Sequence, residues 1–506
     1  MAEYAIEMIG ITKQFPLVLA NDNVDFRVRK GEIHALVGEN GAGKTTLVNI
    51  LYGLLRPDKG SIAVNGMSVH FSGPADAIHS GIGMVHQHFM LIPPLTVTEN
   101  VILGSEPSRA GFVAMDRANE IVQNLSDQYG LKVEPKAKVE TLSVGFEQRI
   151  EIIKVLYRGA EILILDEPTA VLAPQEVGEL FGILRSLKDQ GKTIIFITHK
   201  LQEVMEISDM VTVMRQGKVV GSVATSDTSK SHIATMMVGR TVLFRVERKE
   251  ATPGKEVLKV ENLHSLDKKR VPVLRGVSFN IRAGEIFGIA GVEGNGQTEL
   301  IETLTGLRKA DRGEINIHSS VITNCSPREI KENGIGHIPE DRQRRGLILE
   351  YTVAQNMVLG IHYRRPFIKR LGLDIINFSA IREKAKRLIR DFDIRPTDQE
   401  NLAGNLSGGN QQKVIVAREF DQNPILLIAA QPTRGIDVGS IEFIHKRLIQ
   451  ARDDGKAVLL VSADLEEILS LSDRVAVMYE GRIVGIMAPE EATEERLGMM
   501  MTGGEG

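Results

Sequence analysis

Short apolar runs alternate with amphipathic segments along much of the chain. Residues 33–37 and 162–165 are two such runs, and the first leads into glycines while the second leads into carboxylates. Runs of this length predict buried strands. The apolar positions after the first glycine-rich turn recur at helical spacing and are expected to face a sheet: Leu47, Ile50, Leu51, Leu54 and Leu55. Strands that alternate with such helices predict an α/β fold with mainly parallel sheets.

The chain contains an internal repeat. A strand, a glycine-rich turn and a helix are predicted around residues 38–45 and again around residues 291–298, at an offset of 253 positions. Further along, Leu142 matches Leu406 at an offset of 264, so the second half carries about eleven extra residues between these landmarks. A repeat of this length predicts two similar domains in one chain.

A charged segment that is poor in apolar residues separates the two halves. It is broken by Pro253 and Gly254, as is typical of a short linker. We predict a first domain at residues 1–245, a linker at residues 246–256 and a second domain at residues 257–506.

The composition excludes several classes of protein. The chain has 506 residues, of which 42% are hydrophobic and 25% charged, so we expect globular domains. A net charge of -4 supplies no excess positive charge for a nucleic-acid partner. The single Cys325 indicates a reducing compartment, and no apolar run approaches the roughly 20 residues that cross a bilayer. The first five residues lack the features of a secretory signal, so the predicted location is the cytosol, unless a membrane partner holds the chain.

Residues 38–45 carry the first chemical signal. They read Gly-Glu-Asn-Gly-Ala-Gly-Lys-Thr and fit the phosphate-loop pattern, between a predicted strand and a predicted helix. Glycines let backbone N–H groups approach phosphates, and the start of the helix adds partial positive charge. Lys44 is expected to pair with the β and γ phosphates of ATP, and the Thr45 hydroxyl is expected to ligate Mg²⁺.

A second signal lies at the end of the apolar run 162–165, where Asp166 and Glu167 follow. We expect this strand to lie beside the strand at residues 33–37 in the parallel sheet. Asp166 suits Mg²⁺, held directly or through water, and Glu167 is placed to polarise the attacking water. Two carboxylates at a strand end can instead be ordinary turn or capping residues, but the phosphate loop favours the catalytic interpretation.

Taken in order, the phosphate loop, Gln87, residues 142–149, the Asp166–Glu167 pair and His199 resemble the ABC ATPase superfamily, and the second half repeats the set with losses. The resemblance covers essentially the whole chain. It implies two tandem P-loop ABC ATPase domains, each with a mainly parallel sheet core and a helical subdomain. It also implies that the cofactors are ATP and Mg²⁺.

The resemblance implies a role for each matching residue. Glu167, His199 and Gln87 would act in catalysis, and Thr45, Gln87 and Asp166 would hold Mg²⁺. The implied nucleotide contacts, with Phe15 stacking on adenine, are Phe15, Gly38, Glu39, Asn40, Gly41, Ala42, Gly43, Lys44, Thr45, Thr46, Ser407, Gly408, Gly409 and Asn410. The last four belong to a segment close to the family's LSGGQ signature.

In the superfamily each ATP lies between the phosphate loop of one domain and the signature of the other. The first phosphate loop and the second signature then form one complete site. The complementary site has lost its key side chains, because its lysine, aspartate, glutamate and histidine positions hold Gln297, Ala430, Gln431 and Ala463, and Val144 replaces a signature glycine. Asp437 is retained where it would reach the complete site, whereas Ala173 stands at the matching position of the first half. We therefore predict hydrolysis at one site.

Two fused ATPase halves of this kind suit three classes of the superfamily. Translation-associated members usually have a long charged linker and two intact sites, and repair or chromosome ATPases insert coiled coils or zinc modules. Neither feature occurs in this sequence. The importer class remains, with an enzyme that hydrolyses ATP to drive transport.

Within the importers, residues 432–439 and the sequence Pro-Glu-Asp-Arg at residues 339–342 resemble the ribose and galactose ATPase group, and Glu340 stands where Gln87 stands in the first half. Residues 85–94 and 429–432 resemble its nucleoside branch, which favours purine nucleosides over sugars as cargo. The implied partners are two integral-membrane permease subunits and, indirectly, an extracytoplasmic substrate-binding lipoprotein. The implied location is the cytoplasmic face of the membrane.

Basic residues gather at 342–345 and at 364–370. They could face anionic lipid or the cytoplasmic loops of a permease, or they could form solvated charged surfaces.

Overall fold

The computed structural model describes residues 3–16, 18–86, 89–109, 111–169, 172, 174–240, 248–292, 294–370, 374–501 and 503. The chain divides into two compact units, Met1–Val242 and Leu243–Gly506. The predicted domain limits at residues 245 and 257, and the linker between them, stay predictions.

The first unit contains an antiparallel sheet and a mainly parallel sheet. The antiparallel sheet has the strand order β2-β1-β4-β5, and the other has the order β12-β11-β3-β10-β9-β6. The strands of these sheets are β1 (Tyr4–Phe15), β2 (Val18–Arg29), β3 (Ile33–Gly38), β4 (Lys59–Val64), β5 (Met67–Val69), β6 (Ile82–Val85), β9 (Ile162–Asp166), β10 (Thr193–Ile197), β11 (Met210–Arg215) and β12 (Lys218–Ala224). All pairs in the second sheet are parallel except β11 with β12.

Apolar residues on both faces of β9 explain its continuous apolar sequence. Leu163 and Leu165 belong to one buried cluster, and Ile162 and Ile164 belong to another. A strand that is covered on both faces reads as an apolar run rather than an alternating pattern. The predicted parallel core is therefore confirmed for this unit.

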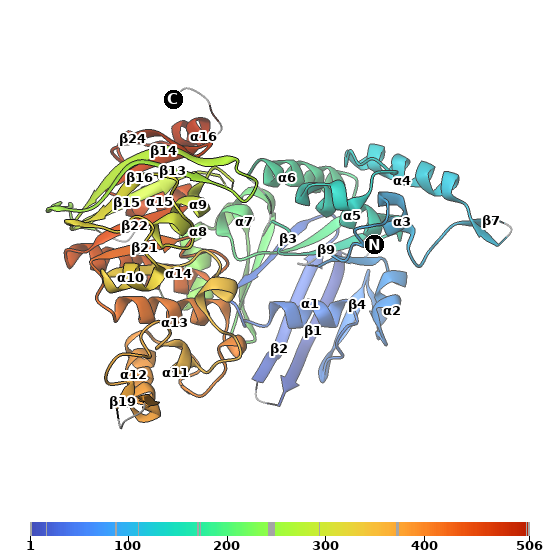
Figure 1. Cartoon of the computed structure of the whole chain (residues 1–506). Helices are drawn as coiled ribbons and strands as arrows, with labels where there is room; N and C mark the ends of the chain where they lie inside the picture. Colours follow the sequence, from blue (N-terminus) through green and yellow to red (C-terminus); the bar gives the residue numbers. More distant parts are fainter. Residues whose placement is uncertain are drawn as a thin grey trace. The chain divides into compact units, whose positions relative to one another are not determined.

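Helices surround this core. They are α1 (Lys44–Leu51), α2 (Pro74–His79), α3 (Val97–Ile102), α4 (Met115–Tyr129), α5 (Val144–Tyr157), α6 (Pro174–Asp189), α7 (Leu201–Ile207) and α8 (Lys230–Val238). Helices α3, α4 and α5 pack together beside the sheet as a helical subdomain, which also bears the hairpin of β7 (Ser108–Arg109) and β8 (Phe112–Val113) (Figure 1).

Two expectations for the first unit are wrong. Leu54 does not face the sheet but is 49% exposed, because α1 ends at Leu51 and the helical spacing ends with it. Strand β9 does not lie beside β3, because β10 pairs with both strands and separates them. The chain reaches β10 from β9 through α6, and this crossover places β10 at the centre of the sheet.

The second unit repeats the architecture, with sheets ordered β14-β13-β16-β17 and β18-β21-β22-β15-β23-β24. Their strands are β13 (Glu256–Leu266), β14 (Pro272–Arg282), β15 (Glu285–Ala290), β16 (Arg312–Ile317), β17 (Ser320–Val321), β18 (Ile335–Ile338), β21 (Leu426–Ala430), β22 (Ala457–Ser462), β23 (Arg474–Tyr479) and β24 (Arg482–Met487). The helices are α9 (Gln297–Leu304), α10 (Pro327–Glu332), α11 (Val353–Asn356), α12 (Phe378–Asp391), α13 (Gly408–Phe420), α14 (Val438–Asp453), α15 (Leu465–Leu471) and α16 (Glu494–Met501). The helical subdomain consists of α11, α12 and α13 with the hairpin of β19 (Ile368–Arg370) and β20 (Asp374–Ile376) (Figure 1).

Among the described residues, no helix combines the length and the apolar character that crossing a bilayer requires.

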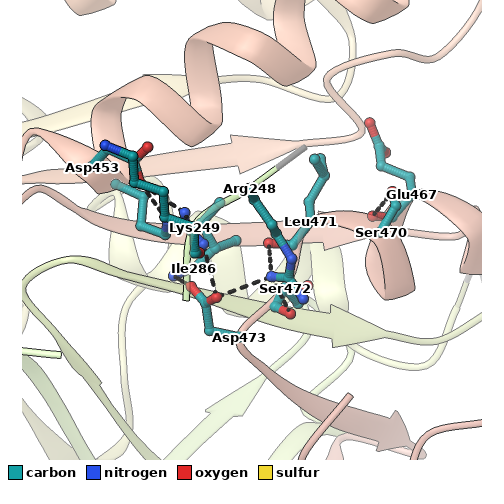
Figure 2. Close-up of polar contacts among 10 residues, drawn as sticks. Arg248, Lys249, Ile286, Asp453, Glu467, Ser470, Leu471, Ser472 and Asp473 are labelled. Carbon is teal, nitrogen blue, oxygen red and sulfur yellow. Dashed lines mark hydrogen bonds and ion pairs between the residues drawn. The ribbon is translucent and has the colours of Figure 1, made fainter. Parts of the chain in front are cut away.

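Asp473 anchors the beginning of the second unit, as Figure 2 shows. One carboxylate oxygen accepts a hydrogen bond from the backbone N–H of Ile286 at 2.8 Å, and the other accepts from Arg248 at 2.9 Å and from Arg452 at 3.0 Å. Arg248 also donates to the carbonyls of Leu471 and Ser472. The segment around Arg248 is therefore fixed to the sheet that carries the second phosphate-loop position.

Replacing Arg248 with alanine is expected to destabilise the chain by about 2 kcal/mol, because it removes hydrogen bonds to a carboxylate that is largely buried. Thermal unfolding of the full chain measures the loss as a melting temperature that falls by several degrees. Arg390→Ala is the control, because the side chain of Arg390 is 79% exposed and, among the ion pairs of the described residues, pairs only with its neighbour Asp391. An equal loss in both variants would contradict the anchoring role.

Candidate ATP site

The phosphate loop of the first unit is set by its backbone. Gly43 has a φ of 97°, and a Cβ at this position would lie 2.2 Å from the carbonyl oxygen of Ala20. Only glycine fits there. Helix α1 begins at the next residue, Lys44, and no side chain caps its N-terminus. The first N–H groups of the helix can therefore donate to phosphate oxygens.

Lys44 is only 6% exposed, and its amine is held inside the loop. It donates to the carbonyl oxygens of Gly38 at 2.7 Å and of Glu39 at 3.1 Å. Asn40, Gly41 and Thr45 are exposed at the same turn. The loop thus combines a preorganised cation with an open face, which is what a triphosphate requires.

Asp166 ends β9 and is 8% exposed. Burial, together with the charge of Glu167, raises its pKa to about 6, although Lys44 opposes this shift. The positive charge near this carboxylate does not offset its burial and the charge of Glu167, so a bound cation would stabilise its ionised form.

Glu167 and His199 lie directly against one another. A carboxylate oxygen of Glu167 is 2.9 Å from Nδ1 of His199, and this hydrogen bond holds the pKa of Glu167 below its usual range despite burial. Glu167 also has a φ of 47°, and its N–H donates to the carbonyl of Ile197 at the end of β10. Because β10 lies next to β9, the histidine that follows β10 meets the glutamate that follows β9. The carboxylate is thus ionised, oriented and able to accept a proton from water.

Glu203 supports this arrangement and was not singled out from the sequence. It is buried on α7 and accepts hydrogen bonds from the hydroxyls of Thr169, at 2.8 Å, and Thr198, at 3.0 Å. These threonines follow the two strands that carry Glu167 and His199. In the sequence, Glu203 is only an acidic residue within a short helix, and its threonine partners could not be identified from the sequence alone.

The oxygen ligands offered by Thr45 and Asp166 fit Mg²⁺, which in proteins is usually held by one or two side chains together with phosphates and water. The raised pKa of Asp166 agrees with a site that expects a cation. Among the described residues, no cluster of three or more acidic, histidine or cysteine side chains forms an all-protein metal site. Bound Mg²⁺ would neutralise phosphate charge as hydrolysis proceeds.

Replacing Asp166 with asparagine is expected to stabilise the nucleotide-free protein. A carboxyl whose folded pKa, about 6, lies above its ordinary value of 3.8 costs stability once it is ionised. The cost reaches about 3 kcal/mol at pH 8, falls to roughly half at pH 5 and vanishes below both pKa values. Melting curves of the variant and the wild type at pH 8 and pH 5 measure it, and a gain that did not shrink at pH 5 would contradict this account.

The structure places the remaining predicted residues as follows. Phe15 is at the end of β1, with 38% of its surface exposed. Ser407 caps α13 by accepting from the N–H of Asn410, and Gly408 and Gly409 open that helix. Gln87 and Ala173 lie outside the described residues. The pairing of the first phosphate loop with the second signature stays a prediction.

The second unit keeps the support but not the reactive groups. Gln431 has a φ of 45°, close to that of Glu167, and its N–H donates to Val461. Buried Glu467 accepts from Thr433 at 2.9 Å and contacts His445 at 2.9 Å, as Glu203 accepts from its threonines. The lysine, aspartate, glutamate and histidine of the first unit are replaced by Gln297, Ala430, Gln431 and Ala463. The second unit therefore has the backbone of a catalytic centre without its charges.

A phosphate loop, a helical signature segment and a paired glutamate and histidine on a parallel sheet define an ABC-type ATPase. The sequence profile described as ABC transporter matches residues 21–170 and 274–434. The chain belongs to the ABC transporter family, and it is an ATPase of that family. The predicted α/β fold with two tandem ATPase domains is confirmed.

Relatives that align with almost the whole chain indicate which group within the family it resembles. The guanosine import ATP-binding protein NupO of Bacillus subtilis (strain 168) is 53% identical over 99% of this chain and 98% of that protein. The nucleoside import ATP-binding protein NupA of Lactococcus lactis subsp. cremoris (strain MG1363) is 51% identical over 99% of both chains. The ribose import ATP-binding protein RbsA 1 of Rubrobacter xylanophilus is 40% identical over 99% of this chain and 98% of that protein. The predicted resemblance to the sugar and nucleoside importer group is confirmed.

Proposed function

We propose that the chain hydrolyses ATP to drive the uptake of purine nucleosides through partner permease subunits. The observation that carries the choice of cargo is the similarity to NupO and NupA over 99% of the chain, at 53% and 51% identity, against 45% and 40% for a glucose-import and a ribose-import relative. Sugar import is the alternative, because the ribose relative matches over the same length.

Hydrolysis takes place at the site built on the first unit. Lys44 and the N–H groups at the start of α1 bind the phosphates, and Thr45 and Asp166 hold Mg²⁺. Glu167 is ionised, so it accepts a proton from the attacking water, and His199 fixes its carboxylate. Ser407, Gly408, Gly409 and Asn410 of the second unit complete the site from the other side of the nucleotide.

The second nucleotide position does not hydrolyse ATP, because Gln431 cannot accept a proton as a carboxylate does and Gln297 carries no charge. ATP binding closes the two halves, and hydrolysis at the complete site reopens them. This motion switches the permease between its outward and inward states.

The partners that fit this function are two integral-membrane permease subunits, which receive cargo from an extracytoplasmic lipoprotein. The chain itself then works as a peripheral protein at the cytoplasmic face of the membrane. Its attachment to the membrane would then rest on the permease subunits.

Uptake of labelled guanosine and labelled ribose tests the cargo. It is measured in the source organism with the gene deleted, and then restored as wild type or as Glu167→Gln. Loss of guanosine uptake on deletion, with rescue only by the wild type, supports a nucleoside importer. Loss of ribose uptake alone moves the protein to the sugar group, and loss of neither overturns both assignments.

A further inference from the structure

Arg342 joins two segments of the second unit. It begins the turn Arg342–Gly346 that follows β18, and it is partly buried. Its Nη1 donates to the carbonyl oxygen of Arg434 at 2.7 Å, and its Nη2 donates to that of Gly435 at 3.3 Å. Both carbonyls belong to the turn between β21 and Asp437, the residue that caps α14. A guanidinium with two carbonyl partners holds its position better than a lysine would.

The same guanidinium lies against the signature segment. A Cβ at Gly408 would come within 2.8 Å of Nη2 of Arg342 and within 3.2 Å of the carbonyl oxygen of Gly435. A residue larger than glycine would therefore displace the arginine from the backbone of Gly408. Through Arg342, the turn at residues 434–435 and the start of α13 are packed as one group.

The first unit differs at both positions of this contact. Phe89 stands at the position of Arg342, at the offset of 253 residues, and Val144 stands at the position of Gly408, at the offset of 264. The arginine and the glycine are thus present together in one unit and replaced together in the other. This agrees with a steric dependence between them.

The positive charge of Arg342 lies at the N-terminus of α13. Helix N-termini favour anions and disfavour cations, yet this guanidinium contacts the first residue of α13. An anion bound at Ser407 and Gly408 would reverse that penalty, because it would interact favourably with both the helix and the arginine.

We propose that Arg342 is a positioning residue of the ATP site, holding the signature segment in the conformation that receives the terminal phosphate of ATP. The proposal rests on the proposed function, in which the second signature completes the site on the first unit. It gives Arg342, the first of the basic residues 342–345, a role that neither lipid binding nor a solvated surface supplies.

The affinities for ATP and for ADP, each with Mg²⁺, test the proposal in the full chain carrying Glu167→Gln, which prevents turnover. Arg342→Ala is expected to weaken ATP binding about tenfold and to leave ADP binding unchanged, because ADP lacks the phosphate that the signature receives. Arg342→Lys is expected to recover part of the loss. Arg344→Ala is the matched control in the same turn, since the Arg344 side chain is 89% exposed, and it should change neither affinity.

Gly408→Ala supplies a second, independent test. It should reproduce the loss of Arg342→Ala, and the double variant should lose little more than either single one, because both changes break one contact. Equal weakening of ATP and ADP, additive losses, or no loss at all would overturn the proposal. If Glu167→Gln and Gln431→Ala lower hydrolysis equally, the proposed function with its single complete site is wrong. If only Glu167→Gln lowers hydrolysis strongly, but Arg342→Ala binds ATP as tightly as the unsubstituted chain, only the proposed role of Arg342 is wrong.

Discussion

Replacing Glu167 with glutamine is expected to reduce ATP hydrolysis by about 100-fold or more, whereas Gln431→Ala leaves most of the activity. The glutamine keeps the size of the side chain but cannot accept a proton, and it loses the charge-assisted bond to His199 that measures 2.9 Å. Release of phosphate at saturating Mg-ATP measures both variants.

The two positions form a matched pair, because Glu167 follows β9, Gln431 follows β21, and each residue has a φ near 45°. If disturbing such a turn were enough to lower hydrolysis, both variants would lose activity. Only a chemical role for the carboxylate predicts an effect confined to Glu167. Similar losses of hydrolysis in the two variants would contradict the proposal that only the site on the first unit hydrolyses ATP.

Replacing Lys44 with alanine is expected to weaken ATP binding about 100-fold, which corresponds to about 2.8 kcal/mol. The amine is 6% exposed and already oriented by two carbonyls, so the triphosphate loses a preorganised charge. Binding of Mg-ATP in the Glu167→Gln background, followed by a fluorescent ATP analogue, measures the change.

Gln297→Ala is the control, because it removes the corresponding side chain of the second phosphate loop, which carries no charge to lose. We expect it to leave the tighter binding event unchanged. A weakening as large as that of Lys44→Ala would place the main nucleotide contact in the second unit and contradict the assignment. Equal melting temperatures would show that neither variant simply unfolds the chain.

The sequence predicted the strands and the phosphate loop well, because local signals determine both. The run at residues 162–165 is apolar throughout and is buried on both faces, and Gly43 is needed for a backbone that no other residue adopts easily. The end of α1 was harder to predict. Leu54 continued the helical spacing in the sequence, but the helix stops at Leu51.

The order of the strands in the sheet could not be predicted from local sequence patterns. The sequence placed the Asp166 strand beside the strand of the phosphate loop, but β10 separates them. The error matters for chemistry, because the intervening strand is what brings His199 to Glu167. The family resemblance identified both residues, but only the three-dimensional structure shows that they form a hydrogen-bonded pair. The contacts of Arg342 and Glu203 join segments far apart in the sequence, so no local pattern revealed them.

The positive φ of Gln431 has a consequence for the turn that follows it in the second unit. A non-glycine residue in this conformation costs of order 1 kcal/mol, and in the first unit the same conformation orients the catalytic carboxylate. Gln431 orients no such group, yet the chain that leaves it presents the carbonyls of Arg434 and Gly435 to Arg342. Under the proposed function, this strained turn would support the signature segment rather than any chemistry at Gln431 itself. Relaxing that turn is expected to weaken the hydrogen bonds of Arg342 to the carbonyls of Arg434 and Gly435.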